Sequence, residues 1–215
     1  MTYIKTENLS FQYLGGSIFK FPDLQIGANE QWLLTGNSGC GKTTLLHLIA
    51  GFLRPAKGTI MVNGHELTSL SQSETDRVRG QNIGIVFQKP HFIQSLTVSE
   101  NLSIARYMNN MKTNKQEILE LLGKLNINDK YNSKPNELSQ GELQRLSIAR
   151  SIINKPAVIL ADEPTSSLDD THCMEAITLL KQQAESTSSA LLIVTHDQRL
   201  HPFFTNIIQL DNIKQ

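Results

Sequence analysis

The chain has 215 residues, 39% of them hydrophobic, so it is long enough for one well-cored domain but short for two large ones. Twenty Lys and Arg residues balance twenty Asp and Glu residues, and this zero net charge argues against a nucleic-acid-binding protein. No window approaches the roughly 18 apolar residues of a membrane span, and the N-terminus has no signal-peptide pattern. We therefore expect a cytoplasmic protein, in which Cys40 and Cys173 are reduced thiols without metal-binding spacing.

Strands dominate the prediction for the first part of the chain. Alternating or continuous apolar residues predict them at residues 3–13, 31–36, 58–67 and 82–88. One helix is predicted to interrupt these strands, over residues 42–53. We expect this part, residues 3–87, to consist mostly of strands.

The second part is predicted to change from helices back to strands. Residues 98–153 read as helices, because leucine, isoleucine and alanine recur on one face in 115–125 and 140–153. Continuous apolar runs are typical of strands in a buried parallel sheet, and they occur at 157–163 and 191–197, separated by a predicted helix at 171–186.

The order of these segments predicts an α/β protein that forms one domain over residues 1–215. We expect a strand-rich β subdomain and an α/β core to take about residues 1–87 and 154–215. A helical subdomain is expected as an insertion at about residues 88–153.

A glycine-rich loop follows the predicted strand at 31–36 and opens the helix after it. Residues 36–43, GNSGCGKT, fit the pattern GxxxxGK[ST], in which backbone N–H groups turn inward around a phosphate. Lys42 is predicted to reach the β- and γ-phosphates, and the Thr43 hydroxyl to bind Mg²⁺. The alternative is a glycine-rich turn with a solvated lysine. The predicted phosphate-binding residues are Gly36, Asn37, Ser38, Gly39, Cys40, Gly41, Lys42, Thr43 and Thr44.

Two carboxylates end the apolar run VILADE at residues 158–163. At the tip of a strand beside the phosphate loop, Asp162 would hold Mg²⁺ through water and Glu163 could polarise an attacking water. The alternative is that both residues cap the next helix. Together with the loop, this pattern predicts a nucleoside triphosphatase.

A second anion site is indicated at residues 137–145, ELSQGELQR. Ser139 and Glu142 fit a capping box, which alone would explain them. A hydroxyl and the bare amide of Gly141 at a helix N-terminus can also bind an anion.

This segment resembles the signature motif of ATP-binding cassette (ABC) ATPases, and the other family motifs follow in the expected order. Gln88 matches the Q-loop, residues 166–169 match the D-loop, and His196 matches the switch histidine. Tyr13 takes the place of the aromatic residue that stacks on adenine. Without the other motifs, Tyr13 could be a core residue with Phe11 as the stacking ring, Gln88 a strand cap and His196 structural.

The resemblance implies a P-loop NTPase (RecA-like) core that binds ATP and Mg²⁺. In the family two cassettes pack head to tail, so Ser139 and Gly141 of one chain would close over ATP held by the other. The implied catalytic residues are Glu163 as general base, His196 as γ-phosphate sensor and Lys42. The implied Mg²⁺ ligands are Thr43, Gln88 and Asp162, and further ATP contacts are implied for Glu142 and Asp169.

The chain departs from the family pattern at Gln140, where a glycine is usual, but the Gly141 amide should still face the phosphate. The remaining histidines, His47, His65, His91, His172 and His201, have no such placement and are expected to be structural.

Residues 70–102 resemble the lipoprotein-release, macrolide-export and cell-division branch of the family. The branch implies a homodimer bound to an integral membrane permease at the inner face of the membrane. Two alternatives remain: an ATPase for envelope remodelling or division that moves no solute, and a soluble ABC ATPase in cofactor assembly or repair.

Overall fold

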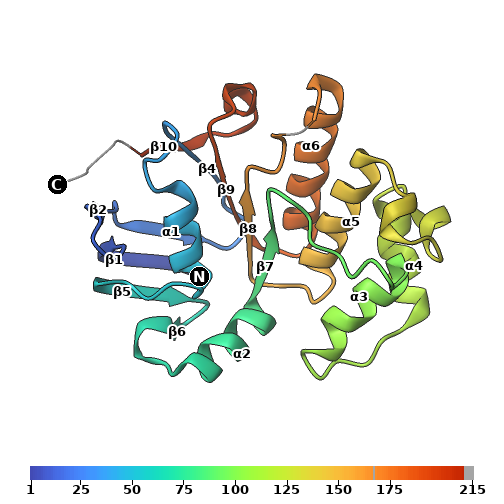
Figure 1. The fold of residues 1–215 in the computed structure, drawn as a ribbon, viewed down its shortest axis with the longest axis horizontal. Helices are drawn as coiled ribbons and strands as arrows, with labels where there is room; N and C mark the ends of the chain where they lie inside the picture. Colours follow the sequence, from blue (N-terminus) through green and yellow to red (C-terminus); the bar gives the residue numbers. More distant parts are fainter. Residues whose placement is uncertain (167, 211–215) are drawn as a thin grey trace.

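The computed structural model describes residues 1–166 and 168–210, and within them the strands form two five-stranded sheets. Figure 1 shows an antiparallel sheet at one end of the molecule, a central parallel sheet, and a group of helices at the other end. This combination of sheets and helices confirms the predicted α/β class.

The antiparallel sheet is built around one long strand, β1 (Thr2–Gln12). This strand pairs along its length with β2 (Ile18–Lys20), β3 (Leu24–Gly27) and β5 (Lys57–Val62), and β5 pairs with β6 (His65–Glu66).

A bulge in β1 changes which side chains face the core. Its register with β5 shifts between Glu7 and Ser10, and Asn8 adopts a φ of 51°, a left-handed conformation that asparagine tolerates. Before the bulge Ile4 points inward, and after it Leu9 and Phe11 do. Two residues past Phe11, the chain leaves the sheet at Tyr13.

The parallel sheet has the strand order β10-β4-β9-β8-β7. Its strands are β4 (Gln31–Thr35), β7 (Ile83–Val86), β8 (Val158–Asp162), β9 (Ala190–Thr195) and β10 (Asn206–Gln209). Thr35 lies opposite Thr195, and Asp162 lies opposite Val194. The segments that follow these three strands therefore leave the sheet at the same edge, where ligands bind in open parallel sheets.

Both faces of the parallel sheet are buried, because alternate side chains enter two different cores. Leu34, Leu160 and Leu192 pack with α1 (Lys42–Ile49) and the antiparallel sheet. Leu33, Ile159 and Leu191 pack with α5 (Gln140–Ile152) and α6 (Asp170–Ser186) on the other face. Figure 1 shows α1 on one side of the sheet and α5 and α6 on the other.

Two further helices and two short turns lie at the helical end of the molecule. They are α3 (Val98–Tyr107) and α4 (Lys115–Lys124), with short 3₁₀ turns η2 (Asn128–Lys130) and η3 (Pro135–Glu137) before α5. The apolar face predicted for 115–125 is buried at Ile118, Leu122 and Leu125. Among the described residues, no helix is long and apolar enough to cross a membrane.

Two sequence predictions for the first part were wrong. The helix predicted over residues 42–53 ends at Ile49. A second helix, α2 (Gln72–Asn82), stands in the region read mostly as strands. A capping box begins α2: the Ser71 hydroxyl accepts from the Glu74 N–H at 3.4 Å, and the Glu74 carboxylate accepts from the Ser71 N–H at 2.9 Å.

Candidate functional site

The loop between β4 and α1 exposes backbone N–H groups at the edge of the parallel sheet. Gly39 and Gly41 have φ angles of 78° and 103°, a region that favours glycine. Gly41 is the N-cap of α1, and as a glycine it has no side chain to accept from the first N–H groups of this helix. The first turn also holds no acidic residue, so the helix N-terminus is open to an anion.

Lys42 lies across this loop. Its side chain is mostly covered, with 7% of the residue exposed, and the ammonium donates to the backbone carbonyls of Gly36 at 2.7 Å and Asn37 at 3.1 Å. A long cation is thus held in place over the N-terminus of α1. The geometry fits the predicted contact with phosphate oxygens.

Thr43 and Asp162 bring oxygen atoms from two elements together beside the loop. The Thr43 hydroxyl donates to the Asp162 carboxylate at 3.2 Å. Burial raises the pKa of Asp162, because a covered carboxylate loses the solvent that stabilises its charge. A nearby divalent cation would compensate the buried charge.

Gln88 adds an amide from the end of β7. It is solvent-accessible, and its Nε2 donates to the Ser166 hydroxyl at 3.4 Å, which leaves the amide oxygen outside that contact. The described residues contain no group of three or more His, Cys, Asp or Glu placed for a metal. Mg²⁺ commonly takes one or two protein oxygens and completes its shell with phosphate and water, so a hydroxyl, a carboxylate and an amide fit it.

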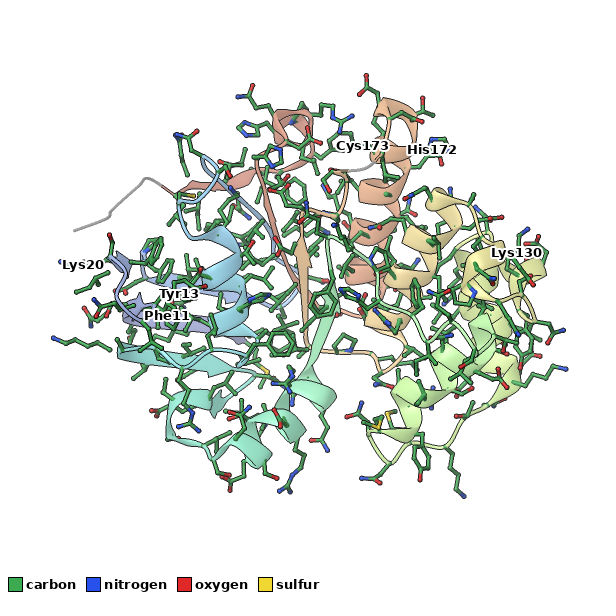
Figure 2. The ribbon with its side chains drawn as sticks, viewed as in Figure 1. Phe11, Tyr13, Lys20, Lys130, His172 and Cys173 are labelled. Carbon is green, nitrogen blue, oxygen red and sulfur yellow. The ribbon has the colours of Figure 1, made fainter. Side chains whose placement is uncertain are left out.

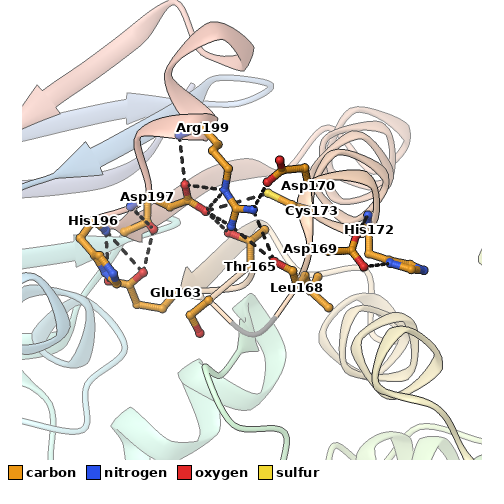
Figure 3. Close-up of polar contacts among 12 residues, drawn as sticks. Glu163, Thr165, Leu168, Asp169, Asp170, His172, Cys173, His196, Asp197 and Arg199 are labelled. Atoms are coloured by element: carbon orange, nitrogen blue, oxygen red, sulfur yellow. Dashed lines mark hydrogen bonds and ion pairs between the residues drawn. The ribbon is translucent and has the colours of Figure 1, made fainter.

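Glu163 and His196 form a close pair at the ends of β8 and β9 (Figure 3). The His196 Nδ1 lies 2.6 Å from the Glu163 carboxylate, which also accepts from the Thr195 hydroxyl at 2.7 Å and from the His196 N–H at 3.1 Å. An ionised carboxylate only accepts, so this contact suits the tautomer of His196 that carries its proton on Nδ1.

The backbone of Glu163 is in an unusual conformation. Its φ is 46°, in the left-handed region, and its N–H donates to the Val194 carbonyl at 2.9 Å. Such strain in a non-glycine residue is found where the surrounding structure fixes a functional group. In this conformation the Glu163 carboxylate contacts His196.

An aromatic group lies beside the first turn of α1 in this site. Tyr13 is 47% exposed, while Phe11 is 9% exposed and packs in the core. The Tyr13 hydroxyl lies 3.1 Å from that of Thr44, and its ring meets Phe11 and Phe19 edge-on. Of the two candidate stacking rings, Tyr13 is the accessible one, and Figure 2 shows it beside the antiparallel sheet.

A single cavity of about 800 Å³ joins most of these groups, a volume within the range of small-molecule sites. The predicted residues that line it are Tyr13, Gly36, Asn37, Ser38, Gly39, Gly41, Lys42, Thr43, Thr44, Gln88, Glu163 and His196.

The cavity is also lined by residues that were not predicted from the sequence, namely Phe19, Thr35, Gln198, His201 and Gln209. Thr35 directly precedes the glycine-rich loop, and Gln198 follows His196 by two residues. Their closeness to these motifs is the signal that could have identified them as lining residues. Nothing in the sequence marked Phe19, His201 or Gln209. His201 had been expected to be structural, whereas it reaches the cavity from η4 (Gln198–Phe203).

Cys40 and Asp169 lie outside the cavity lining. Cys40 is 3% exposed and packs in the core, so only its backbone is able to face a nucleotide. Asp169 caps α6: its carboxylate accepts from the His172 N–H at 3.0 Å and contacts the His172 ring at 2.7 Å. Ser167, in the predicted D-loop, lies outside the described residues.

The signature segment also lies outside the cavity lining. The Ser139 hydroxyl accepts from the Glu142 N–H at 3.3 Å, and the Glu142 carboxylate accepts from the Ser139 N–H at 2.7 Å and pairs with Lys130 at 3.2 Å. The pKa of Glu142 is lowered mainly by the hydrogen bond from the Ser139 N–H, and the nearby Lys130 lowers it further. Figure 2 shows Lys130 at the helical end, opposite Tyr13.

Comparison with known proteins agrees with this geometry. Residues 19–166 match the protein family described as "ABC transporter". The chain is 34% identical over 203 residues to the lipoprotein-releasing system ATP-binding protein LolD of Hydrogenovibrio crunogenus, and the match covers 92% of this chain and 88% of that relative.

Solved structures of similar cassettes share the fold. The dimeric bacterial ABC transporter cassette MJ0796 superposes with a TM-score of 0.86 at 32% identity, covering 97% of this chain and 94% of that one. A post-hydrolysis dimer of MJ0796 bound to ADP and Pi gives a TM-score of 0.86 at 30% identity, covering 98% of this chain and 97% of that one. The predicted P-loop NTPase core is therefore confirmed.

Proposed function

This chain belongs to the ABC transporter family of ATPases, and we propose that two copies of it close head to tail around two ATP molecules to drive a separate membrane subunit. ATP hydrolysis is the activity of the family. The dimer, the residue roles and the membrane partner are the proposed steps.

The observation that carries the proposal is that the predicted signature residues lie outside the cavity of their own chain. The cavity contains the phosphate loop, Glu163 and His196, but neither Ser139 nor Gly141 lines it. Ser139 is exposed at the N-terminus of α5, where a hydroxyl and free helix amides suit an anion. A second chain placed head to tail would bring these groups to the open side of the nucleotide.

The residues of one chain account for nucleotide binding. The loop amides and the N-terminus of α1 would bind the phosphates, and Lys42 would exchange its carbonyl contacts for phosphate oxygens. Tyr13 would stack on adenine. Thr43, Asp162 and Gln88 would hold Mg²⁺, which when bound neutralises negative charge on the phosphate oxygens.

Hydrolysis would use the pair at the ends of β8 and β9. Glu163 accepts a proton from a water whose oxygen attacks the γ-phosphorus, while the bond to the β–γ bridging oxygen breaks and ADP takes the electron pair. His196, fixed by Glu163 through Nδ1, directs its Nε2 edge to the γ-phosphate. Ser139 and Gly141 of the second chain would exclude solvent during this step, and loss of the shared phosphate would let the dimer open.

A membrane partner would use the surface that follows Gln88. The large exposed apolar residues of this region are Ile93, Ile104, Tyr107, Met108 and Met111, and such a concentration suits a protein contact. The likeness to a lipoprotein-releasing ATP-binding protein supports a permease as that contact, with this chain on the cytoplasmic face of the membrane. An ATPase of envelope remodelling would use the same surface, and the partner identified by co-purification from membranes separates the two.

The test uses Glu163→Gln, which keeps the size of the side chain and removes its basicity. Hydrolysis should fall by roughly 10² to 10⁴ while ATP binding remains. Because the γ-phosphate stays uncleaved, the variant should have a dimer mass by light scattering with ATP and a monomer mass without it.

Glu117→Gln is the matched control, because this partly exposed carboxylate pairs with Arg106 far from the cavity. It should hydrolyse ATP at the unmodified rate. A monomer mass for Glu163→Gln with saturating ATP, even at high protein concentration, would contradict the head-to-tail dimer.

A further inference from the structure

Arg199 joins two segments that carry different parts of the proposed ATPase (Figure 3). On one side it binds Asp197, with Nε 2.9 Å and an η-nitrogen 2.7 Å from the carboxylate oxygens. On the other side it pairs with Asp170 at 2.6 Å and approaches the Leu168 carbonyl at 3.4 Å. One guanidinium thus connects the residues after β9 to the turn before α6.

The contacts continue from Asp197 to the catalytic pair. The Asp197 N–H donates to the Thr195 hydroxyl at 3.0 Å, and that hydroxyl donates to Glu163 at 2.7 Å. The Asp197 carboxylate also accepts from the Thr165 hydroxyl at 3.1 Å. Its hydrogen bonds with Arg199 hold the pKa of Asp197 below the usual value, so this carboxylate remains ionised and paired.

At its other end, the network reaches the segment next to the signature helix. The Asp170 side chain is 85% exposed. Its neighbour Asp169 caps α6, because the Asp169 carboxylate accepts from the His172 N–H. The ring of His172 is close to the start of α5, because a Cβ placed on Gly141 would lie 3.7 Å from its Cδ2. The turn at 168–170 therefore lies between the site's own catalytic pair and the residues proposed to serve the second ATP.

We propose that Arg199 is a positioning residue that ties the turn at 168–170 to the Glu163–His196 pair, so that hydrolysis responds to closure by the second subunit. This inference rests on the proposed head-to-tail dimer. Arg199 does not line the cavity, so it acts through Asp197 and Thr195 rather than on ATP.

Arginine suits this position for a physical reason. Its planar guanidinium offers five donors in a fixed geometry and binds two carboxylates and a carbonyl at once. A lysine ammonium is a single charged point that would hold one carboxylate well. Movement of the 168–170 turn by a docking partner is therefore transmitted to Asp197 through the guanidinium, while the Thr165 hydroxyl holds the same carboxylate from the segment before the turn.

The first measurement is steady-state ATPase activity of the full chain. Arg199→Ala should lower kcat by about ten- to a hundredfold, the range expected from small misplacement of catalytic groups, with KM for ATP changed less than about twofold. Cooperativity with respect to ATP should fall as well, because one subunit no longer senses the other. Arg199→Lys should recover part of kcat.

Asp170→Ala removes the exposed half of the link without touching Asp197. It should lower kcat in the same direction, and the double variant Arg199→Ala/Asp170→Ala should be no slower than Arg199→Ala alone, since both changes break one link. Glu117→Ala is the control, because it removes a carboxylate paired with an arginine at the same 2.6 Å distance but between α3 and α4.

The outcomes separate this inference from the proposed function. If Glu163→Gln dimerises with ATP while both Arg199→Ala and Asp170→Ala keep the unmodified kcat and cooperativity, the dimer stands and the role of Arg199 is rejected. If the variants lose thermal stability and KM rises together with the fall in kcat, Arg199 is structural and the inference is rejected too. Failure of Glu163→Gln to dimerise rejects the underlying proposal.

Discussion

Tyr13 comes two residues after Phe11, just past the end of β1, and the two rings differ in what they can contact. Phe11 fills the core between the antiparallel sheet and α1, whereas the Tyr13 ring is open on the cavity side. Sequence alternation alone assigns both to one face. Their difference in accessibility arises because β1 ends at Gln12, where the sheet no longer covers the next ring.

Tyr13→Ala is expected to weaken ATP binding by about 1 to 3 kcal/mol, the usual loss for a base–aromatic stack. Tyr13→Phe keeps the ring and loses only the hydroxyl contact to Thr44, so its effect should be smaller. Phe11→Ala should instead lower the free energy of unfolding by about 3 to 5 kcal/mol, as for other buried aromatic residues. Titration calorimetry and thermal melts distinguish these effects, and a larger binding loss for Phe11→Ala than for Tyr13→Ala would assign the stack to Phe11.

Lys42→Ala is expected to abolish tight ATP binding, because the phosphates would lose their main side-chain counter-ion. The fold should survive, since within residues 1–166 and 168–210 the hydrogen bonds of the ammonium go to the Gly36 and Asn37 carbonyls of its own loop. Nucleotide binding followed by equilibrium dialysis, with circular dichroism as the folding check, measures both. Near-native affinity in this variant would contradict the assignment of the phosphate loop.

At the residue scale, the site residues that belong to short motifs could be predicted from the sequence. Residues whose partners are distant in the sequence could not. Lys42, Glu163 and His196 stand in local patterns whose chemistry is readable. Arg199 has no such pattern, because its partner Asp170 is 29 residues away and only the fold brings the two together. The burial of Cys40 could not be predicted from the sequence either, because it depends on how the loop turns over the core.

At the element scale, the predicted strands and helices were recovered best where burial was complete. The runs at β8 and β9 are buried throughout, so their hydrophobicity gives their position directly. Helix α2 was missed because it buries only Thr75, Val78 and Asn82 and presents polar residues elsewhere. Its capping box, Ser71 with Glu74, was the signal that could have revealed it.

The N-terminus of α5 carries an acidic residue where the proposed dimer needs to accept phosphate. Glu142 is held by the Ser139 N–H, and Lys130 from η2 pairs with it at 3.2 Å. The pair offsets a negative charge that would otherwise repel the γ-phosphate of the second subunit. Lys130 thus supports the signature segment from a separate element.

Lys130→Ala in the Glu163→Gln chain should therefore raise the ATP concentration needed for dimerisation by roughly two- to tenfold, the range of a partly screened charge pair. Adding Glu142→Gln, which removes the unpaired charge and keeps a side chain able to accept from the Ser139 N–H, should restore most of the loss. Light scattering across an ATP series gives both midpoints. Equal midpoints with and without Lys130 would mean that Glu142 does not face the phosphate.

For the whole molecule, the arrangement of elements explains why the proposed mechanism needs two chains. The cavity lies at the carboxyl edge of the parallel sheet, while the signature segment begins α5 on the helical side. The sequence order of motifs does not reveal this separation; only the topology does. The division into subdomains near residues 88 and 153 stays a prediction of the sequence.

The position of Ser139 provides the most direct test of the complete assembly. Ser139→Arg places a bulky cation where the phosphate of the second subunit must dock, and overpacking at such a contact opposes closure. In the Glu163→Gln chain with ATP, this change should convert the dimer to a monomer, while ATP binding to the monomer persists because Ser139 is outside the cavity lining.

Ser71→Arg is the matched control for this change. Ser71 caps α2 through the same capping box that Ser139 forms at α5, so both substitutions remove a cap worth about 0.5 to 2 kcal/mol. Their effects on thermal stability should therefore be similar. Light scattering with ATP should still give a dimer for Ser71→Arg/Glu163→Gln and a monomer for Ser139→Arg/Glu163→Gln. If both double variants remain dimers, the dimer contact does not use the α5 N-terminus; if both become monomers, loss of a helix cap alone disrupts the assembly.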